Sequence, residues 1–181
     1  YENPEQYHER QASLPRDLRS PWRLEKTQFD PPWTRFEVTK RGQPFGTFKV
    51  PLMGRHNLLN ALAVIAVADD LRLPADVISH ALETFEGIKR RQEVRGIKSG
   101  IMVIDDFAHH PTEVRETLAA ARSFYPNKRL VAVFEPRTNS SRRKVFQDRY
   151  PDSFDTADLV CIRKPPLLEK ILVEEWFLSK Q

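Results

Sequence analysis

The chain has 181 residues, 40% of them apolar and 30% charged, which is the composition of a folded globular protein. Its single cysteine, Cys161, excludes an intramolecular disulfide, and no apolar stretch approaches the roughly 20 residues that cross a bilayer. The net charge of +4 comes from bases interspersed with acids, which is typical of a solvated surface. We therefore expect a cytoplasmic protein with no nucleic-acid or membrane partner.

The first half of the chain predicts a hairpin followed by two helices. The first 33 residues are rich in proline, tryptophan and charge and have no clear period. Residues 34–52 alternate apolar and polar side chains on both sides of Arg-Gly-Gln-Pro, which indicates a β-hairpin. Residues 54–73 predict a helix whose middle is apolar except for Asn60, so we expect it to be buried nearly all round. Pro74 ends that helix and begins the next.

The second half of the chain predicts a separate α/β domain. Residues 86–96, EGIKRRQEVRG, are polar and basic, which indicates a linker between a domain at 1–88 and a domain at 89–181. After it we expect a strand at 101–105, a helix at 111–125, a strand at 129–136, a helix at 141–150 and a strand at 157–163. Apolar strands that alternate with helices are typical of a parallel sheet covered on both faces. Ligands bind such sheets at the carboxyl ends of the strands.

An acidic and imidazole-rich loop, DDFAHHP at 105–111, lies at one of these strand ends. A metal site is one interpretation, although adjacent histidines point in different directions and no HxH, HExxH or CxxC motif occurs. A polar turn is another, because Pro111 suits the first helical position, Glu113 complements the helix dipole, and the aspartates can accept from backbone N–H groups. His110 would then be the residue that enters the helix. A substrate-holding loop is the third interpretation.

A basic loop, PRTNSSRR at 136–143, lies at the end of the next strand. Ser140 or Ser141 is a suitable N-cap, which places the bases at 142–144 in the first turn of the helix. Cations are unfavourable there unless an anion is bound nearby, and Arg137 adds a planar donor that suits carboxylate or phosphate. A solvated basic turn is the alternative. The two loops together favour a cleft for a zwitterionic or anionic substrate.

The motifs, taken in order, resemble those of the Mur ligases, the ATP-dependent amide ligases of peptidoglycan synthesis. GRHNLLNALAVIA, KRRQEVRG, VIDDFAHHPTEVRETLAA and VFEPRTNSSRR carry the resemblance over about residues 34–162. It implies the end of a central ATPase domain followed by part of a C-terminal α/β domain, with a mostly parallel sheet of dinucleotide-binding type. No glycine of the chain precedes Lys-Ser or Lys-Thr, so we expect the P-loop, the main Mg²⁺ ligands and the UDP-binding domain elsewhere, and no activity from this chain alone.

The resemblance also implies a mechanism and residue roles. A muramate carboxylate attacks the γ-phosphate of ATP, and the incoming amine displaces phosphate from the acyl phosphate. Asn57 and Asn60 lie on one helical face and suit an adenine edge, although capping of the preceding hairpin explains them equally well. The implied ATP contacts are Asn57, Asn60, Arg91 and Asp106; the implied catalytic residues are Asp106, Arg91 and His109; the implied contacts to the amine substrate are His109, His110, Arg137, Thr138, Asn139 and Arg143; no metal ligand is expected in this chain.

The expected partners follow from the branch of the family. KRRQEVRG and FEPRTNSSRR look most like the ligases that join the tripeptide L-alanyl-γ-D-glutamyl-meso-diaminopimelate to UDP-N-acetylmuramate. The branch that uses L-alanine is the alternative. Outside the family, the remaining interpretations are a non-catalytic α/β binding module and a metal-dependent hydrolase.

Overall fold

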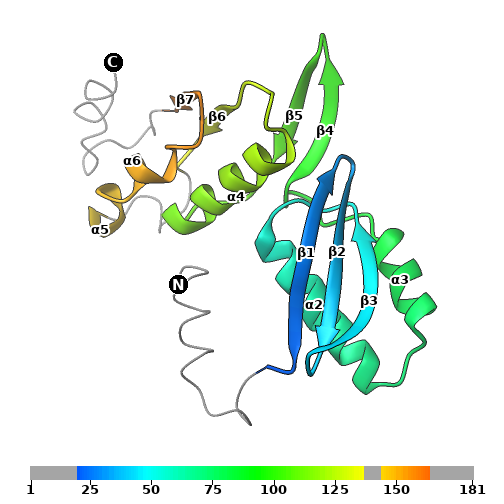
Figure 1. The fold of residues 1–181 in the computed structure, drawn as a ribbon. Helices are drawn as coiled ribbons and strands as arrows, with labels where there is room; N and C mark the ends of the chain where they lie inside the picture. Colours follow the sequence, from blue (N-terminus) through cyan, green and yellow to red (C-terminus); the bar gives the residue numbers. More distant parts are fainter. Residues whose placement is uncertain (1–19, 137–143, 164–181) are drawn as a thin grey trace. The chain divides into compact units, whose positions relative to one another are not determined.

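The computed structural model describes residues 20–136 and 144–163, and the chain divides into two compact units, Tyr1–Glu86 and Gly87–Gln181 (Figure 1). The first unit contains β1 (Trp22–Asp30), β2 (Trp33–Lys40), β3 (Gln43–Val50), α2 (Arg55–Asp70) and α3 (Ala75–Glu83). The second contains β4 (Glu93–Lys98), β5 (Ile101–Asp105), α4 (Pro111–Phe124), β6 (Val131–Phe134), α5 (Lys144–Gln147), α6 (Tyr150–Ser153) and β7 (Leu159–Ile162).

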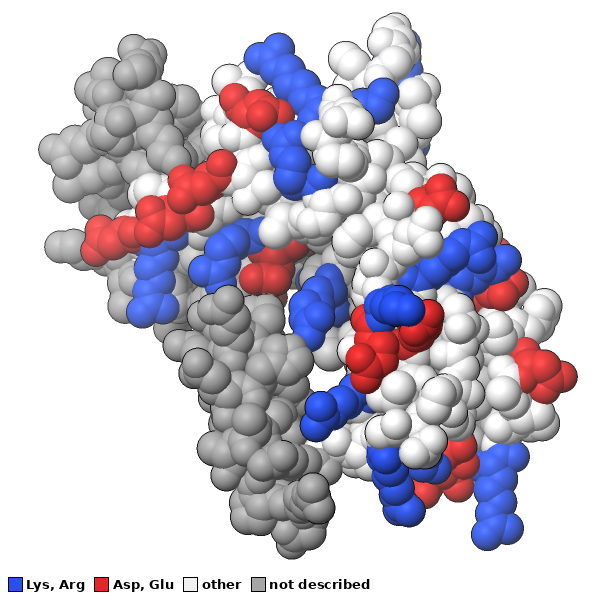
Figure 2. Space-filling view, in the orientation of Figure 1, with Lys and Arg blue, Asp and Glu red and all other residues white. Residues whose placement is uncertain are grey.

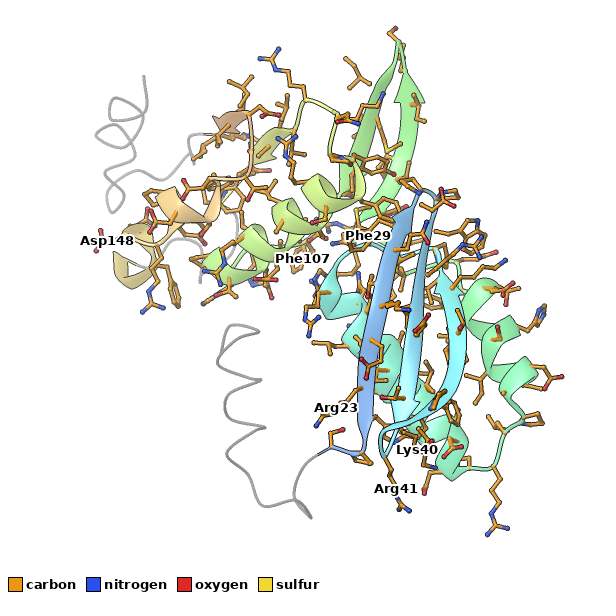
Figure 3. All side chains as sticks on the ribbon, in the orientation of Figure 1. Arg23, Phe29, Lys40, Arg41, Phe107 and Asp148 are labelled. Atoms are coloured by element: carbon orange, nitrogen blue, oxygen red, sulfur yellow. The ribbon has the colours of Figure 1, made fainter. Side chains whose placement is uncertain are left out.

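The first unit is a three-stranded antiparallel sheet, in the order β1-β2-β3, with helices packed against one face. The hairpin predicted at 34–52 is confirmed: Lys40 pairs with Gln43 across a two-residue loop. Both loop residues, Arg41 and Gly42, have positive φ angles of 53° and 79°, as two-residue hairpin turns of the primed type require. Figure 3 labels Lys40 and Arg41 at this end of the sheet, where Lys40 contacts the carboxylate of Asp69 in α2.

The core of the first unit follows from the alternation of β2 and β3. Phe36, Val38, Phe48 and Val50 point to the same face and are buried, while Arg35 and Glu37 between them are exposed. The helices add further buried residues, namely Leu58, Ala61, Ile65 and Ala68 from α2 and Ile78 and Leu82 from α3.

One expectation for the first unit is wrong, and one strand was missed. The helix at 55–70 is buried along one face only, and Val64 and Val67 on the other face are 57% and 61% exposed. Within this unit the helix packs against the sheet on one side only. The helix therefore has more apolar side chains than the sheet can bury. The strand β1 was also not expected, because it is an edge strand whose side chains are mostly exposed and therefore show no apolar alternation.

The second unit has the predicted helix α4 and a parallel pair of strands, β6 and β7. In Figure 1, α4 and α6 lie beside this pair. One face of the pair contributes Ala132 and is packed against Val114 and Leu118 of α4 and Tyr150 and Phe154 of the α6 region. In the described part of the predicted helix at 141–150 the structure has only the short helix α5, and a second short helix, α6, begins at the last predicted residue. The suggested N-cap residues Ser140 and Ser141 lie outside the described residues.

Two further expectations fail around β4. The segment interpreted as a linker contains this strand, which forms an antiparallel hairpin with β5. The strand at 101–105 therefore pairs with β4 rather than with the parallel strands, within the residues that the structure describes. Ile101 and Val103 are 67% and 54% exposed, so an apolar run in sequence did not indicate burial on both faces here. The polar composition of β4 hid it because both faces of the hairpin are largely exposed.

Charged side chains of both signs share the visible surface. On the face shown in Figure 2, Lys and Arg side chains are interspersed with Asp and Glu rather than gathered in one stripe. Among the helices in the described ranges, none has the length and apolar character to span a bilayer.

Candidate active-site loop

The loop between β5 and α4 is held at its first residue by the Asp106 carboxylate. One carboxylate oxygen, Oδ2, accepts from the backbone N–H of Gln92 at 2.9 Å, and Oδ1 accepts from the backbone N–H of Ala108 at 2.6 Å. A third bond runs from the Phe107 backbone N–H to the Arg90 carbonyl at 2.8 Å. Charge-assisted bonds to backbone donors are among the stronger hydrogen bonds in proteins. Asp106 therefore ties the loop to the turn that precedes β4.

That turn belongs to the KRRQEVRG motif and has a constrained backbone. Arg90 and Gln92 have positive φ angles of 59° and 51°, which are uncommon for residues with a Cβ atom and are enriched at functional sites. The Arg90 guanidinium lies 4.9 Å from the centre of the Phe107 ring, and its Nε lies 3.9 Å from Asp105. Figure 3 labels Phe107 at this loop, where the ring is partly exposed. The two motifs recognised separately in the sequence thus form one structural feature.

The end of the loop is the N-cap of α4, as the polar-turn interpretation predicted. His110 is the N-cap residue, and its Nδ1 accepts from the Thr112 backbone N–H at 3.3 Å. Glu113 closes a capping box: its Oε2 accepts from the backbone N–H groups of His109 and His110 at 3.1 and 3.2 Å. Pro111 occupies the first helical position. These contacts satisfy backbone donors that a helix N-terminus otherwise leaves unpaired.

When the two imidazoles are neutral, their hydrogen bonds assign them different tautomers. His109 Nδ1 lies 3.0 Å from the Phe107 carbonyl, which can only accept, so Nδ1 carries the proton and Nε2 has a lone pair. His110 Nδ1 accepts from a backbone N–H, so its proton is on Nε2. The loop therefore offers a basic nitrogen from His109 and an N–H donor from His110. This pair suits an amine on one side and an anionic oxygen on the other.

The Glu113 carboxylate, which accepts from the backbone N–H groups of both histidines, also lies 3.5 Å from the His109 Nδ1 atom. Partial burial raises its pKa, but the backbone donors of His109 and His110, the Arg91 charge and the charge that His109 carries when protonated outweigh burial and hold the pKa below its ordinary value. Because the folded-state pKa is depressed, this carboxylate stabilises the fold above its unfolded pKa. The contribution is lost as the pH falls through the folded-state pKa.

We predict that Glu113→Ala destabilises the second unit by about 1–2 kcal/mol, the usual cost of removing a helix cap. Glu113→Gln should cost less stability at neutral pH, because the amide oxygen still accepts a hydrogen bond. It should also remove the loss of stability that protonation of Glu113 causes at acidic pH. Urea unfolding at pH 7 and at pH 3–4 measures both effects. Glu116→Ala, on the same helix and in a 3.6 Å ion pair with its neighbour Arg115, is the matched control. A loss for Glu116→Ala as large as that for Glu113→Ala would contradict the capping role.

The other residues predicted for the site lie in three places. Asn57 and Asn60 are in α2 of the first unit, where the Asn57 side-chain amide donates to the Met53 carbonyl at 2.9 Å, as the capping interpretation allowed. Arg91 is exposed in the turn before β4 and lies close enough to Glu113 to lower its pKa. Arg137, Thr138, Asn139 and Arg143 lie outside the described residues.

Two contacts to the loop were not predicted from the sequence. The Tyr150 hydroxyl donates to the His109 carbonyl, and the Phe146 ring packs edge-on against the His110 imidazole at 4.8 Å. Both residues follow the basic loop and are about 40 positions from the histidines, so no local pattern links them. In the described ranges, no three His, Cys, Asp or Glu side chains lie where they could hold a metal ion.

Comparison with known proteins extends this picture. Residues 90–171 match the family described as "Mur ligase, glutamate ligase domain". A UDP-N-acetylmuramate–L-alanine ligase from Leuconostoc citreum is 47% identical over 70% of this chain and 28% of its own length. The corresponding ligase from Anaeromyxobacter is 43% identical over 71% of this chain and 28% of its own length. The chain thus spans less than a third of the curated relatives it matches.

Two solved structures have the same fold with recognisable sequence identity. The UDP-N-acetylmuramate–alanine ligase of Thermotoga maritima superposes with a TM-score of 0.70 at 31% identity, over 78% of this chain and 31% of that structure. The murein peptide ligase of Psychrobacter arcticus superposes with a TM-score of 0.56 at 34% identity, over 91% of this chain and 35% of that structure. Residues 90–171 therefore match the C-terminal domain of the Mur ligases, and the second unit has the α/β fold of that domain.

Proposed function

We propose that the chain is part of an ATP-dependent amide ligase of bacterial peptidoglycan synthesis that works in the cytoplasm and couples an amine to UDP-N-acetylmuramate. The observation that carries this proposal is the loop 105–111, whose two histidines make different ring hydrogen bonds inside the segment that matches the Mur ligase family. Mur ligases are ATP-dependent amide ligases. The ligase activity, its substrates and its partners are proposed for the whole protein, of which the relatives suggest this chain is a minor part.

We propose L-alanine as the amine substrate. The curated relatives cited above, at 43% and 47% identity, carry L-alanine in their names. They support the L-alanine branch better than the tripeptide branch that the loop sequences favoured. The tripeptide remains the second candidate because FEPRTNSSRR places Arg137 and Thr138 in the basic loop, and because the murein peptide ligase structure covers more of this chain than the alanine ligase structure does.

Within this proposal ATP supplies the phosphoryl group that activates the muramate carboxylate, with Mg²⁺ held mainly by residues outside this chain. Asn57, Asn60, Arg91 and Asp106 are proposed to serve the nucleotide. The Asp106 contacts suggest that it acts largely by fixing the loop, because each of its oxygens already accepts a backbone hydrogen bond. Arg91 remains exposed and can approach an anion. The proposed amine contacts are His109 and His110, with Arg137, Thr138, Asn139 and Arg143 from the basic loop.

Replacing either histidine should affect the amine far more than the nucleotide. We predict that His109→Ala and His110→Ala in the full-length protein each raise KM for the amine substrate about 10- to 100-fold. This range is expected when one hydrogen bond to a charged group is lost. The KM for ATP should change less than about twofold. His80→Ala, in α3 of the first unit, is the control. A collapse of ATP binding in the histidine variants would show that the loop serves the nucleotide instead.

The amine is identified by a direct comparison of substrates. The full-length protein is incubated with ATP, UDP-N-acetylmuramate and either L-alanine or L-alanyl-γ-D-glutamyl-meso-diaminopimelate, and the nucleotide-sugar products are separated by mass. The proposal predicts the L-alanine adduct with a higher kcat/KM. A higher kcat/KM for the tripeptide would identify the tripeptide, the second candidate, as the amine substrate. Absence of both adducts, with folded protein, would contradict the ligase proposal.

A further inference from the structure

We propose that Tyr150 is a positioning residue that fixes the orientation and tautomer of the His109 imidazole by holding the His109 peptide. The Tyr150 hydroxyl donates to the His109 carbonyl, while the His109 backbone N–H donates to Glu113 at 3.1 Å. Both backbone polar groups of His109 are therefore bonded to side chains that come from different helices. This leaves the His109 backbone little freedom to rotate about either neighbouring peptide.

The fixed backbone determines where the ring lies. His109 Nδ1 reaches the Phe107 carbonyl at 3.0 Å, and the ring packs edge-on against Phe107 at 5.1 Å between centres. A change in the His109 backbone angles would move Nδ1 away from that carbonyl and allow the proton to shift to Nε2. The Tyr150 bond therefore favours the tautomer in which Nε2 accepts a hydrogen bond. This role deepens, and rests on, the proposed binding of an amine at His109.

Tyr150 is itself fixed in position by the side chains packed around it. It is only 6% exposed and belongs to the core of the second unit with Val114, Leu118 and Phe154. Its ring packs against Phe134 at 5.4 Å between centres. Burial, with a smaller contribution from the Glu113 charge, raises the pKa of Tyr150 to about 12. The hydroxyl consequently keeps its proton, and remains a donor, throughout the physiological range.

Tyr150 belongs to a short segment that contacts both histidines. It follows the basic loop in sequence, and Phe146 of the same segment packs against His110 at 4.8 Å between ring centres. The segment 146–150 thus touches both histidines, one through a hydroxyl and the other through a ring. The positions of Phe146 and Tyr150 therefore affect the positions of the two imidazoles.

The test compares Tyr150→Phe with Tyr125→Phe. Tyr150→Phe removes only the donor and keeps the packed ring. Tyr125→Phe removes the same atom from a second tyrosine, which is partly buried at the end of α4, and is the matched control. Long-range ¹H–¹⁵N spectra of the imidazoles in the 181-residue chain report which nitrogen carries each proton. The KM values of the full-length protein for the amine and for ATP report the effect on binding.

The proposal predicts that Tyr150→Phe mixes the His109 tautomers, with ¹⁵N shifts moving toward their average, while Tyr125→Phe leaves them unchanged. The KM for the amine should rise about three- to tenfold, as for loss of one hydrogen bond, with the KM for ATP unchanged. Unchanged His109 nitrogens in a folded Tyr150→Phe variant would overturn the positioning role. An altered His109 tautomer in a protein that forms no amide product would support the positioning role and contradict the proposed function.

Discussion

Asp106→Ala should lower kcat/KM of the full-length protein for ATP by about 100-fold or more, because misplacing a catalytic loop by about 1 Å costs on that order. The neighbouring Asp105→Ala should lower it less than about fivefold. The two residues have the same side chain and are adjacent, so Asp105→Ala serves as the control for Asp106→Ala. Steady-state kinetics with ATP as the varied substrate, at saturating amine, measures the difference.

The large difference follows from what each carboxylate contacts. Asp106 accepts from Gln92 and Ala108 and so joins the loop to the turn before β4. Asp105 has a 3.9 Å ion pair with Arg90 in which both side chains are substantially exposed, and such pairs contribute no more than about 1 kcal/mol. Equal losses in the two variants would contradict this assignment. Loss of slow amide exchange at Gln92 and Ala108 in Asp106→Ala alone would support it independently of activity.

Phe154→Ala should destabilise the second unit by about 3–5 kcal/mol, which is the usual cost of deleting a buried phenylalanine ring. Phe154 is 2% exposed, contacts Phe134 at 5.5 Å between ring centres and lies in the same core as Tyr150. Native-state hydrogen exchange resolves the effect by element: amides of α4 and β6 should lose protection. Phe154→Leu should cost less because it leaves a smaller cavity.

Ile65→Ala is the counterpart for the first unit. Ile65 is fully buried in a core that also contains Phe36 and Phe48, so its truncation should cost about 2–5 kcal/mol and should lower protection in α2 and β2. Each variant should lower protection in its own unit more than in the other. A Phe154→Ala variant that loses less than about 1 kcal/mol would contradict the assignment of Phe154 to the core.

The sequence predicted the elements whose patterns are local. The helix at 111–124 begins where Pro111 and Glu113 indicated, since a helix N-terminus is specified by residues within one turn. The hairpin at 33–50 was predicted because one face of its strands is buried and the other is not. The parallel strands 131–134 and 159–162 were found from their short apolar runs.

The sequence could not predict features that depend on distant partners. The strands 22–30 and 93–98 are largely exposed and so have no apolar period to reveal them. Tyr150 and Glu113 lie more than 30 positions apart in the sequence but contact the same histidine, and only the folded chain brings them together. The tautomers of His109 and His110 likewise depend on one carbonyl and one backbone N–H that composition cannot identify.

The proposed ligase chemistry is tested most directly by following oxygen from the acid substrate. UDP-N-acetylmuramate labelled with ¹⁸O in its carboxylate is incubated with the full-length protein, ATP, Mg²⁺ and L-alanine, and the released phosphate is analysed by mass spectrometry. Attack of the carboxylate on the γ-phosphate transfers one labelled oxygen to phosphate when the amine displaces it. We therefore predict one ¹⁸O atom in each phosphate released, in step with formation of the amide. Phosphate that is released without the label, or amide formed without phosphate release, would contradict the proposed function.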